Sequence, residues 1–154
     1  MSESGKLTKQ IQVELAQLES LMARHPQLLA KRAEDQVSPV EIDAVAALLH
    51  SFYTGIENIF NRISITLDGG PPKTDNWHIA LLDSMASPAP NRGPVISETL
   101  RASLRQFLDF RHVFRHAYSF NLQWNKMAPL VAECQPTFAR VKDELASFVK
   151  TLHV

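Results

Sequence analysis

The sequence is poor in the residues that interrupt helices and in those that build covalent or metal-bound frameworks. Only five of its 154 residues are glycine, and only one is cysteine. Few glycines and long stretches without turn residues argue against a sheet with many turns and favour helices. The lone Cys134 excludes an internal disulfide framework and a cysteine-rich zinc site. Its apolar neighbours predict a small side chain in the core.

The sequence also lacks net charge, because 16 basic residues balance 16 acidic ones. Bulk charge therefore gives no indication of nucleic-acid binding, and such an activity must come from a local patch. The N-terminal residues contain no apolar signal region, and no apolar run approaches the length of a membrane span. We expect a soluble, cytoplasmic protein with no membrane partner. The length and the 45% hydrophobic content predict one domain, residues 1–154, around a hydrophobic core.

Apolar residues recur at helical spacing along most of the chain. The sequence contains no repeat and no strand-like alternation of useful length. The predicted fold class is therefore all-α, a bundle of four or five helices. The helices are expected at about residues 7–24, 38–67, 75–85, 97–118 and 127–152.

Several of the expected helix ends are marked by residues that typically start, stop or bend a helix. His25-Pro26 should end or kink the first helix, because the residue before proline disfavours helical backbone. Ser38-Pro39 fits a capped start, and Asp68-Gly69-Gly70 fits a sharp stop. Asp75 is the expected cap of the third helix. Pro136 should kink or split the last helix.

One charged residue interrupts the apolar stripe of the fourth helix. Arg111 occupies a position whose stripe neighbours are Leu104, Phe107 and Phe114. A charge taken out of water is costly unless it is paired or hydrogen-bonded. Arg111 therefore needs a partner within the fold, such as Glu57 or Asp109, or in a ligand.

Around Arg111 lie three more basic or titratable side chains: His112, Arg115 and His116. No acidic residue falls between Asp109 and Tyr118, so this stretch is a positive patch in a neutral protein. Guanidinium groups match phosphate oxygens, and histidine transfers protons near neutral pH. Because RNA carries its own nucleophile, the 2′-hydroxyl, such groups suffice to cleave it without a metal or cofactor.

The spacing within this patch sets a geometric limit. Arg111, Arg115 and Tyr118 share one side of an ideal helix, while His112 and His116 lie on a neighbouring face. Arg111 and His116 are separated by about 140° around the helix axis. They converge if the helix lines a cleft, deforms locally, or faces a copy of itself across a dimer axis. Of these we favour a composite site in a homodimer.

At these residues the chain resembles a known family. Arg111, four residues, His116, one residue and Tyr118 match the HEPN ribonuclease motif in the form seen in HepT-like toxins. Residues 52–60 resemble the long helix of HepT-like proteins, and the Trp77-His78 and Leu81-Leu82 pairs add to the similarity. Together these segments cover roughly residues 40 to 130. His112 departs from the pattern, since many HEPN motifs have a polar residue, often asparagine, directly after the arginine.

The resemblance implies a homodimeric helical bundle that cleaves RNA, such as tRNA or mRNA, without a metal. Arg111 and His116 match the catalytic pair. From their own chemistry and position, His112, Arg115 and Glu57 are expected to support the site or to bind phosphate. The resemblance also implies a toxin–antitoxin system in which a minimal nucleotidyltransferase is the antitoxin. In such systems the tyrosine matching Tyr118 accepts AMP, which would fill the positive site with anionic charge.

Other interpretations stand beside this one. The chain is alternatively a non-catalytic HEPN-type module that binds a nucleotide or a partner protein. A third possibility is an interaction bundle whose basic patch is an interface. At the level of single residues, Arg115 is either solvated or phosphate-binding, and Glu57 either orients an arginine or lies exposed. His112 and His116 have a spacing also used in metal sites, but no carboxylate pattern accompanies it, so we expect no metal.

Overall fold

The computed structural model describes residues 2–116 and 122–153. Within these ranges it contains six helices and no strands: α1 (Glu3–Ala23), α2 (Pro26–Leu29), α3 (Pro39–Leu67), α4 (Trp77–Met85), α5 (Glu98–His116) and α6 (Trp124–Thr151). The all-α prediction is confirmed. The five longer helices correspond to the five expected ones. The sixth, α2, is a single turn that follows the predicted break at His25-Pro26.

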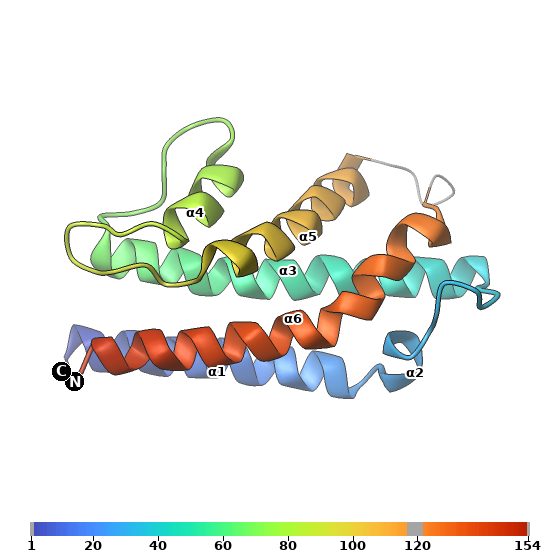
Figure 1. Ribbon diagram of the computed structural model, residues 1–154, viewed down its shortest axis with the longest axis horizontal. Coiled ribbons are helices and arrows are strands. Elements are labelled where there is room, and N and C mark those ends of the chain that lie inside the picture. Colours follow the sequence, from blue (N-terminus) through green and yellow to red (C-terminus); the bar gives the residue numbers. More distant parts are fainter. Residues whose placement is uncertain (1, 117–121, 154) are drawn as a thin grey trace.

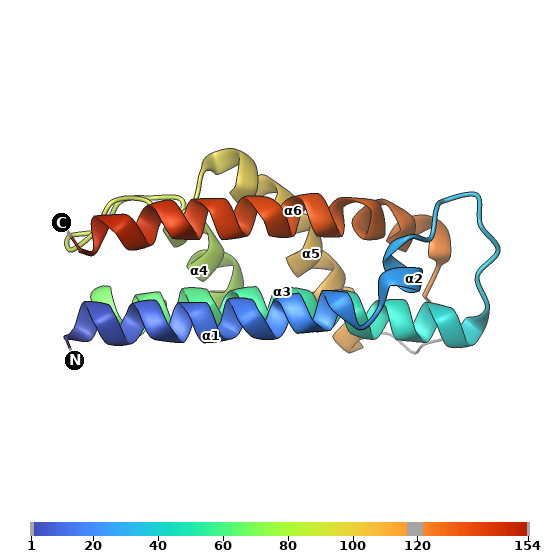
Figure 2. The ribbon, with the colours of Figure 1, turned by 90° about the horizontal axis from the view of Figure 1, so that it is seen from below.

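Three helices run along the long axis of the molecule, and the other two long elements pack across them. Figure 1 shows α1, α3 and α6 extended along this axis, with both chain termini at the same end. The same three helices lie along it in the view from below (Figure 2). Helix α5 crosses α3 obliquely, and α4 contacts both α3 and α5. This arrangement brings three helices together at the place where α4 meets α5.

Helix α3 is the central element, and its two ends are encoded locally. The Ser38 side chain accepts a hydrogen bond from the Glu41 backbone, and the Glu41 side chain accepts one from the Ser38 backbone. This capping box satisfies two amide groups that a helix start would otherwise leave unpaired. At the other end Gly69 and Gly70 have φ angles of 80° and 115°, which side-chain-bearing residues rarely adopt. Both predicted boundaries are confirmed.

Two local predictions need correction or refinement. Asp75 does not cap α4: Asn76 occupies the cap position and makes no capping hydrogen bond. The Asn76 side-chain oxygen instead accepts a bond from the Thr74 hydroxyl at 2.8 Å, so it is engaged in the preceding turn. Pro136 does not split α6, which continues from Trp124 to Thr151 through it. The helix also contains Pro129, and Figure 1 shows it bending in its orange part, so internal prolines bend this helix without breaking it.

One hydrophobic cluster takes buried side chains from all six helices. Its largest fully buried members include Phe52, Tyr53, Phe60 and Phe107. Cys134 is completely buried, as predicted, and burial raises the pKa of its thiol to about 12. No helix in the part of the chain that the structure describes is long and apolar enough to span a membrane.

The loop between α4 and α5 is held by a single buried arginine. Arg92 donates to both carboxylate oxygens of Asp68, at 3.0 and 2.8 Å, beyond the end of α3. It also donates to the backbone carbonyls of Ser84 and Ser87. Because these partners belong to the ends of α3 and α4, Arg92 fixes the position of α4 beside α3.

Candidate functional site

Arg111 lies buried in α5 and is paired with a carboxylate from α3. Its Nη1 donates to Glu57 Oε1 at 3.0 Å, and its Nη2 donates to Glu57 Oε2 at 3.2 Å. The Arg111 Cζ also lies 5.4 Å from the centre of the Tyr53 ring. A buried ion pair needs good geometry to offset the loss of hydration, and this two-point contact supplies it. Glu57 is thus buried and orients the arginine, which was one of the two alternatives left open by the sequence.

His78 of α4 is the third member of this network. Its Nδ1 lies 2.8 Å from Glu57 Oε2 and 2.8 Å from Arg111 Nη2. The Trp77 and His78 rings lie over each other, with centroids 3.6 Å apart. Sequence reasoning did not assign His78 to the site. The only sequence feature that pointed to it was the Trp77-His78 pair of the family resemblance. Because the site takes residues from three different helices, no regular spacing along the chain connects them.

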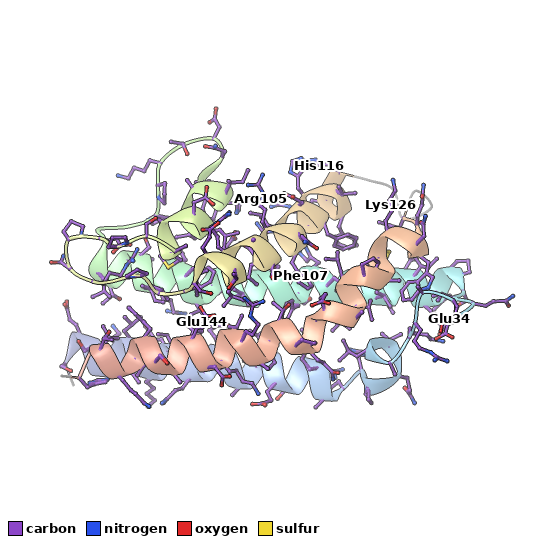
Figure 3. The ribbon with its side chains drawn as sticks, in the orientation of Figure 1. Glu34, Arg105, Phe107, His116, Lys126 and Glu144 are labelled. Atoms are coloured by element: carbon purple, nitrogen blue, oxygen red, sulfur yellow. The ribbon has the colours of Figure 1, made fainter. Side chains whose placement is uncertain are left out.

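A pocket of about 500 Å³ opens above this network, between α4 and α5. We call it the α4–α5 pocket. Its lining includes the basic and histidine side chains of His78 from α4 and Arg111, His112, Arg115 and His116 from α5, together with the acidic Asp75 and Asp109. Figure 3 shows Arg105, which also lines it, along α5 and His116 at the end of that helix. The structure therefore gathers the positive patch predicted from sequence into one concave site.

The separation of Arg111 and His116 around the helix does not place them in different cavities. Both line the α4–α5 pocket, and the rings of His112 and His116 lie side by side with centroids 4.6 Å apart. The helix lines a cleft, which was one of the three solutions considered for the angle of about 140°. The pocket is wide enough to receive side chains from two neighbouring faces. A single chain thus brings both residues to one cavity, and the homodimer stays a prediction.

Three arginines and two aspartates, Asp75 and Asp109, line the pocket, and not all of these charges are paired within the described part of the fold. Glu57 pairs with Arg111, and Asp109 pairs with Arg105 at 2.8 Å. Arg115 is exposed and has no ion pair within residues 2–116 and 122–153. Its charge is therefore available to an anionic ligand.

Two residues of α3, His50 and Tyr53, have pKa values that are shifted by burial and by the charges of the site. Burial lowers the pKa of His50, and the positive charges of Arg111 and Arg115 lower it further. Burial also raises the pKa of the Tyr53 phenol well above its usual range, with the Glu57 carboxylate adding to the effect. Both shifts follow from a low-dielectric interior beside fixed charges. Tyr53 consequently stays neutral and forms an uncharged wall against Arg111.

The remaining predicted residues can now be placed. Tyr118 lies outside the described residues. His112 is exposed and faces the pocket rather than the core. Among the residues that the structure describes, no group of three or more histidine, cysteine, aspartate or glutamate side chains is arranged to hold a metal ion.

Comparison with known families connects this geometry to a group of proteins. Residues 44–152 match the family model described as HepT-like protein, and this range contains every lining residue of the α4–α5 pocket. The chain belongs to the HepT-like family. The match confirms the resemblance seen in the sequence and extends it through α6. Neither the comparison with curated proteins nor that with solved structures gives a match.

Proposed function

We propose that this HepT-like protein is a metal-independent endoribonuclease and the toxin of a toxin–antitoxin system. The observation that carries the proposal is the α4–α5 pocket, whose lining includes both Arg111 and His116. The family gives the class of activity, and the pocket supplies a concave site with positive charge and proton carriers. These are the parts that phosphodiester cleavage by an internal 2′-hydroxyl requires.

Each residue of the pocket has a role in this proposal. Arg111, held rigidly by Glu57, stabilises the negative charge that develops on the phosphate oxygens. Arg115 binds the phosphate backbone through its exposed guanidinium group. His116 transfers a proton during cleavage, and His112 supports it from the neighbouring turn. Preorganised charge of this kind requires little rearrangement at the moment of reaction.

The proposed partners follow from the family. A minimal nucleotidyltransferase neutralises the toxin by transferring AMP to Tyr118, two residues beyond His116 in the sequence. The added phosphate would compete with RNA for the positive charge of Arg111 and Arg115. A homodimer would place two such pockets side by side and allow both to act on one RNA.

A second candidate is a non-catalytic module that binds a nucleotide or a partner protein. The observation in its favour is that Glu57 already balances the charge of Arg111, as in a purely structural ion pair. This candidate predicts nucleotide binding in the α4–α5 pocket without cleavage of RNA. It is therefore separated from the first by a cleavage assay.

The test is incubation of the purified protein with varied RNAs, including tRNA, in the presence of a chelator. We expect cleavage by the native protein and its loss in His116→Ala, whose side chain is exposed and does not support the fold. His25→Ala, a histidine at the start of α2 outside the pocket, is the matched control and should cleave normally. A well-folded native protein that leaves all RNAs intact would overturn the ribonuclease proposal in favour of the binding module.

Arg111→Ala should also abolish cleavage, but this substitution leaves Glu57 buried without its partner. Its unfolding transition must therefore be measured beside its activity. Loss of cleavage at temperatures well below that transition assigns the effect to the site. Full activity in a folded Arg111→Ala protein would contradict the role given to this residue.

A further inference from the structure

We infer that His78 is a second catalytic residue, the general base that removes the proton from the RNA 2′-hydroxyl, with Glu57 holding its ring in position. The inference rests on the proposed ribonuclease function and adds a residue that lies outside the matched motif. Cleavage by a 2′-hydroxyl requires two proton transfers, one from the nucleophile and one to the leaving 5′-oxygen. The motif supplies one histidine per chain, His116, and His78 gives the same pocket a proton carrier from outside the motif.

We place the proton of His78 on Nδ1, which has two polar neighbours at the same distance. Glu57 Oε2, at 2.8 Å, can only accept, whereas Arg111 Nη2, also at 2.8 Å, can only donate. Arg111 Nη2 already has Glu57 Oε2 as its acceptor. A proton on Nδ1 satisfies the Glu57 carboxylate but leaves the second N–H of Arg111 Nη2 facing another donor, and this tautomer is favoured because the bond to an anionic acceptor is the stronger one. The opposite tautomer would place the Nδ1 lone pair against an anionic oxygen with no hydrogen between them.

A proton on Nδ1 leaves the lone pair of the ring on Nε2. No hydrogen bond to Nε2 is formed by the residues that the structure describes. The His78 side chain is 28% exposed and lines the α4–α5 pocket, whereas Glu57 beneath it is buried. A buried carboxylate on one ring nitrogen and an open lone pair on the other is the arrangement that makes histidine a general base.

The position of His78 suits it to this role better than that of His112. In-line displacement at phosphorus places the nucleophile and the leaving group on opposite sides, so the base and the acid should approach from different walls. His78 comes from α4 and His116 from α5, on two walls of the same pocket. His112 lies next to His116 on one helix, with ring centroids 4.6 Å apart, and its contacts include no carboxylate in the described part of the chain.

The step is balanced as follows. His78 Nε2 takes the 2′-hydroxyl proton while the 2′-oxygen forms a bond to phosphorus. The bond from phosphorus to the 5′-oxygen breaks, and the 5′-oxygen takes a proton from His116. The products are a 2′,3′-cyclic phosphate and a free 5′-hydroxyl. Proton exchange with water then restores both histidines, and no metal or co-reactant takes part in the step.

The charged groups that surround His78 are compatible with this step. Glu57 faces it from α3 and stabilises the imidazolium that forms, while Arg111 faces it from α5 and opposes that charge. The pocket that His78 lines also contains Arg105, Arg115 and His116 and the acidic Asp75 and Asp109. Because Arg111 is paired with the same carboxylate, the cluster of Glu57, Arg111 and neutral His78 carries no net charge before the reaction.

The first test separates catalysis from mere positioning with the substitution His78→Asn. The asparagine amide nitrogen can take the place of Nδ1 and donate to Glu57, but nothing replaces Nε2. We expect kcat for RNA cleavage to fall by about 10² to 10⁴-fold while the unfolding midpoint stays close to that of the native protein. His25→Asn is the matched control. Native-like cleavage by His78→Asn would overturn the inference and leave the ribonuclease proposal standing.

The second test distinguishes the base from the acid. The cleavage site is mapped with native protein, and an oligonucleotide is made in which sulfur replaces the 5′-oxygen at that phosphate. Sulfur leaves without a proton, so His116→Ala should recover most of its activity on this substrate. His78→Asn should not recover, because the 2′-hydroxyl still needs its base. Recovery in His78→Asn would overturn the assignment, and native protein that cleaves no RNA would overturn both it and the proposed function.

Discussion

Arg111 and Glu57 lie 54 residues apart in the chain and form a buried, two-point ion pair at 3.0 and 3.2 Å. The pair joins α5 to α3 directly beneath the α4–α5 pocket. It explains how a charged residue can occupy the apolar stripe of α5. It also fixes the guanidinium group in the orientation that the proposed chemistry uses.

This pair gives the first prediction. Glu57→Leu should destabilise the fold by about 3 to 5 kcal/mol, because Arg111 would remain buried without a counter-charge. The double variant Glu57→Leu with Arg111→Met replaces both charges by apolar groups, so it should recover most of that loss and still fail to cleave RNA. Urea unfolding and the cleavage assay measure the two effects. A double variant no more stable than Glu57→Leu would contradict this account of the pair.

Arg115 should affect RNA binding and leave stability unchanged. Because its side chain is exposed, Arg115→Gln should change the free energy of unfolding by no more than about 0.5 kcal/mol. It should weaken binding of single-stranded RNA and reduce the slope of log K against log salt by about 0.7, the loss of one phosphate contact. Fluorescence anisotropy at several salt concentrations measures both quantities. Arg24→Gln, exposed at the end of α1, should leave the slope unaltered.

Cys134 should be chemically inert in the folded protein. Burial raises the pKa of its thiol to about 12, and only the thiolate is an effective nucleophile. At pH 8 we expect iodoacetamide to leave the native protein unmodified while it labels the same protein rapidly in urea. Mass spectrometry after matched incubation times gives the comparison. Equal labelling rates in the two states would show that this part of the core opens readily.

The chain contains two tyrosines, which makes the proposed modification easy to test. The protein is incubated with ATP and the nucleotidyltransferase partner, and added AMP mass is sought. We expect the addition in the native protein and in Tyr53→Phe, since Tyr53 is completely buried. Tyr118→Phe should remain unmodified. If Tyr118→Phe gains as much AMP as the native protein, that residue is not the sole acceptor.

The Tyr53→Phe control is also informative about stability. The Tyr53 hydroxyl is buried and has no hydrogen-bond partner among the described residues. Its removal should therefore leave the free energy of unfolding unchanged or raise it, because no hydrogen bond is lost and a desolvated polar group disappears. Thermal unfolding of the two proteins tests this. A large loss of stability would point to a partner for the hydroxyl.

Local sequence signals predicted most of the helix boundaries. Where such a signal failed, contacts with other parts of the chain determined the local structure. The Ser38 capping box and the glycines after Asp68 set the ends of α3 as expected, because these signals act within one turn of the chain. Asp75 failed as a cap because the turn at Thr74 moved the helix start by one residue. Pro136 did not split α6, because packing along the rest of the helix offsets the hydrogen bond that proline removes.

The sequence by itself determined the helices, the positive patch from Arg111 to His116 and the need of Arg111 for a partner, since periodicity and charge are properties of neighbouring residues. Only the tertiary structure decided which carboxylate pairs with Arg111 and that His78 joins this pair. It also decided that Arg111 and His116 line one pocket. These contacts join three helices across 21 to 54 residues of chain. The residue pattern of a single helix does not determine how α3, α4 and α5 pack against one another, and this packing brings the site residues together.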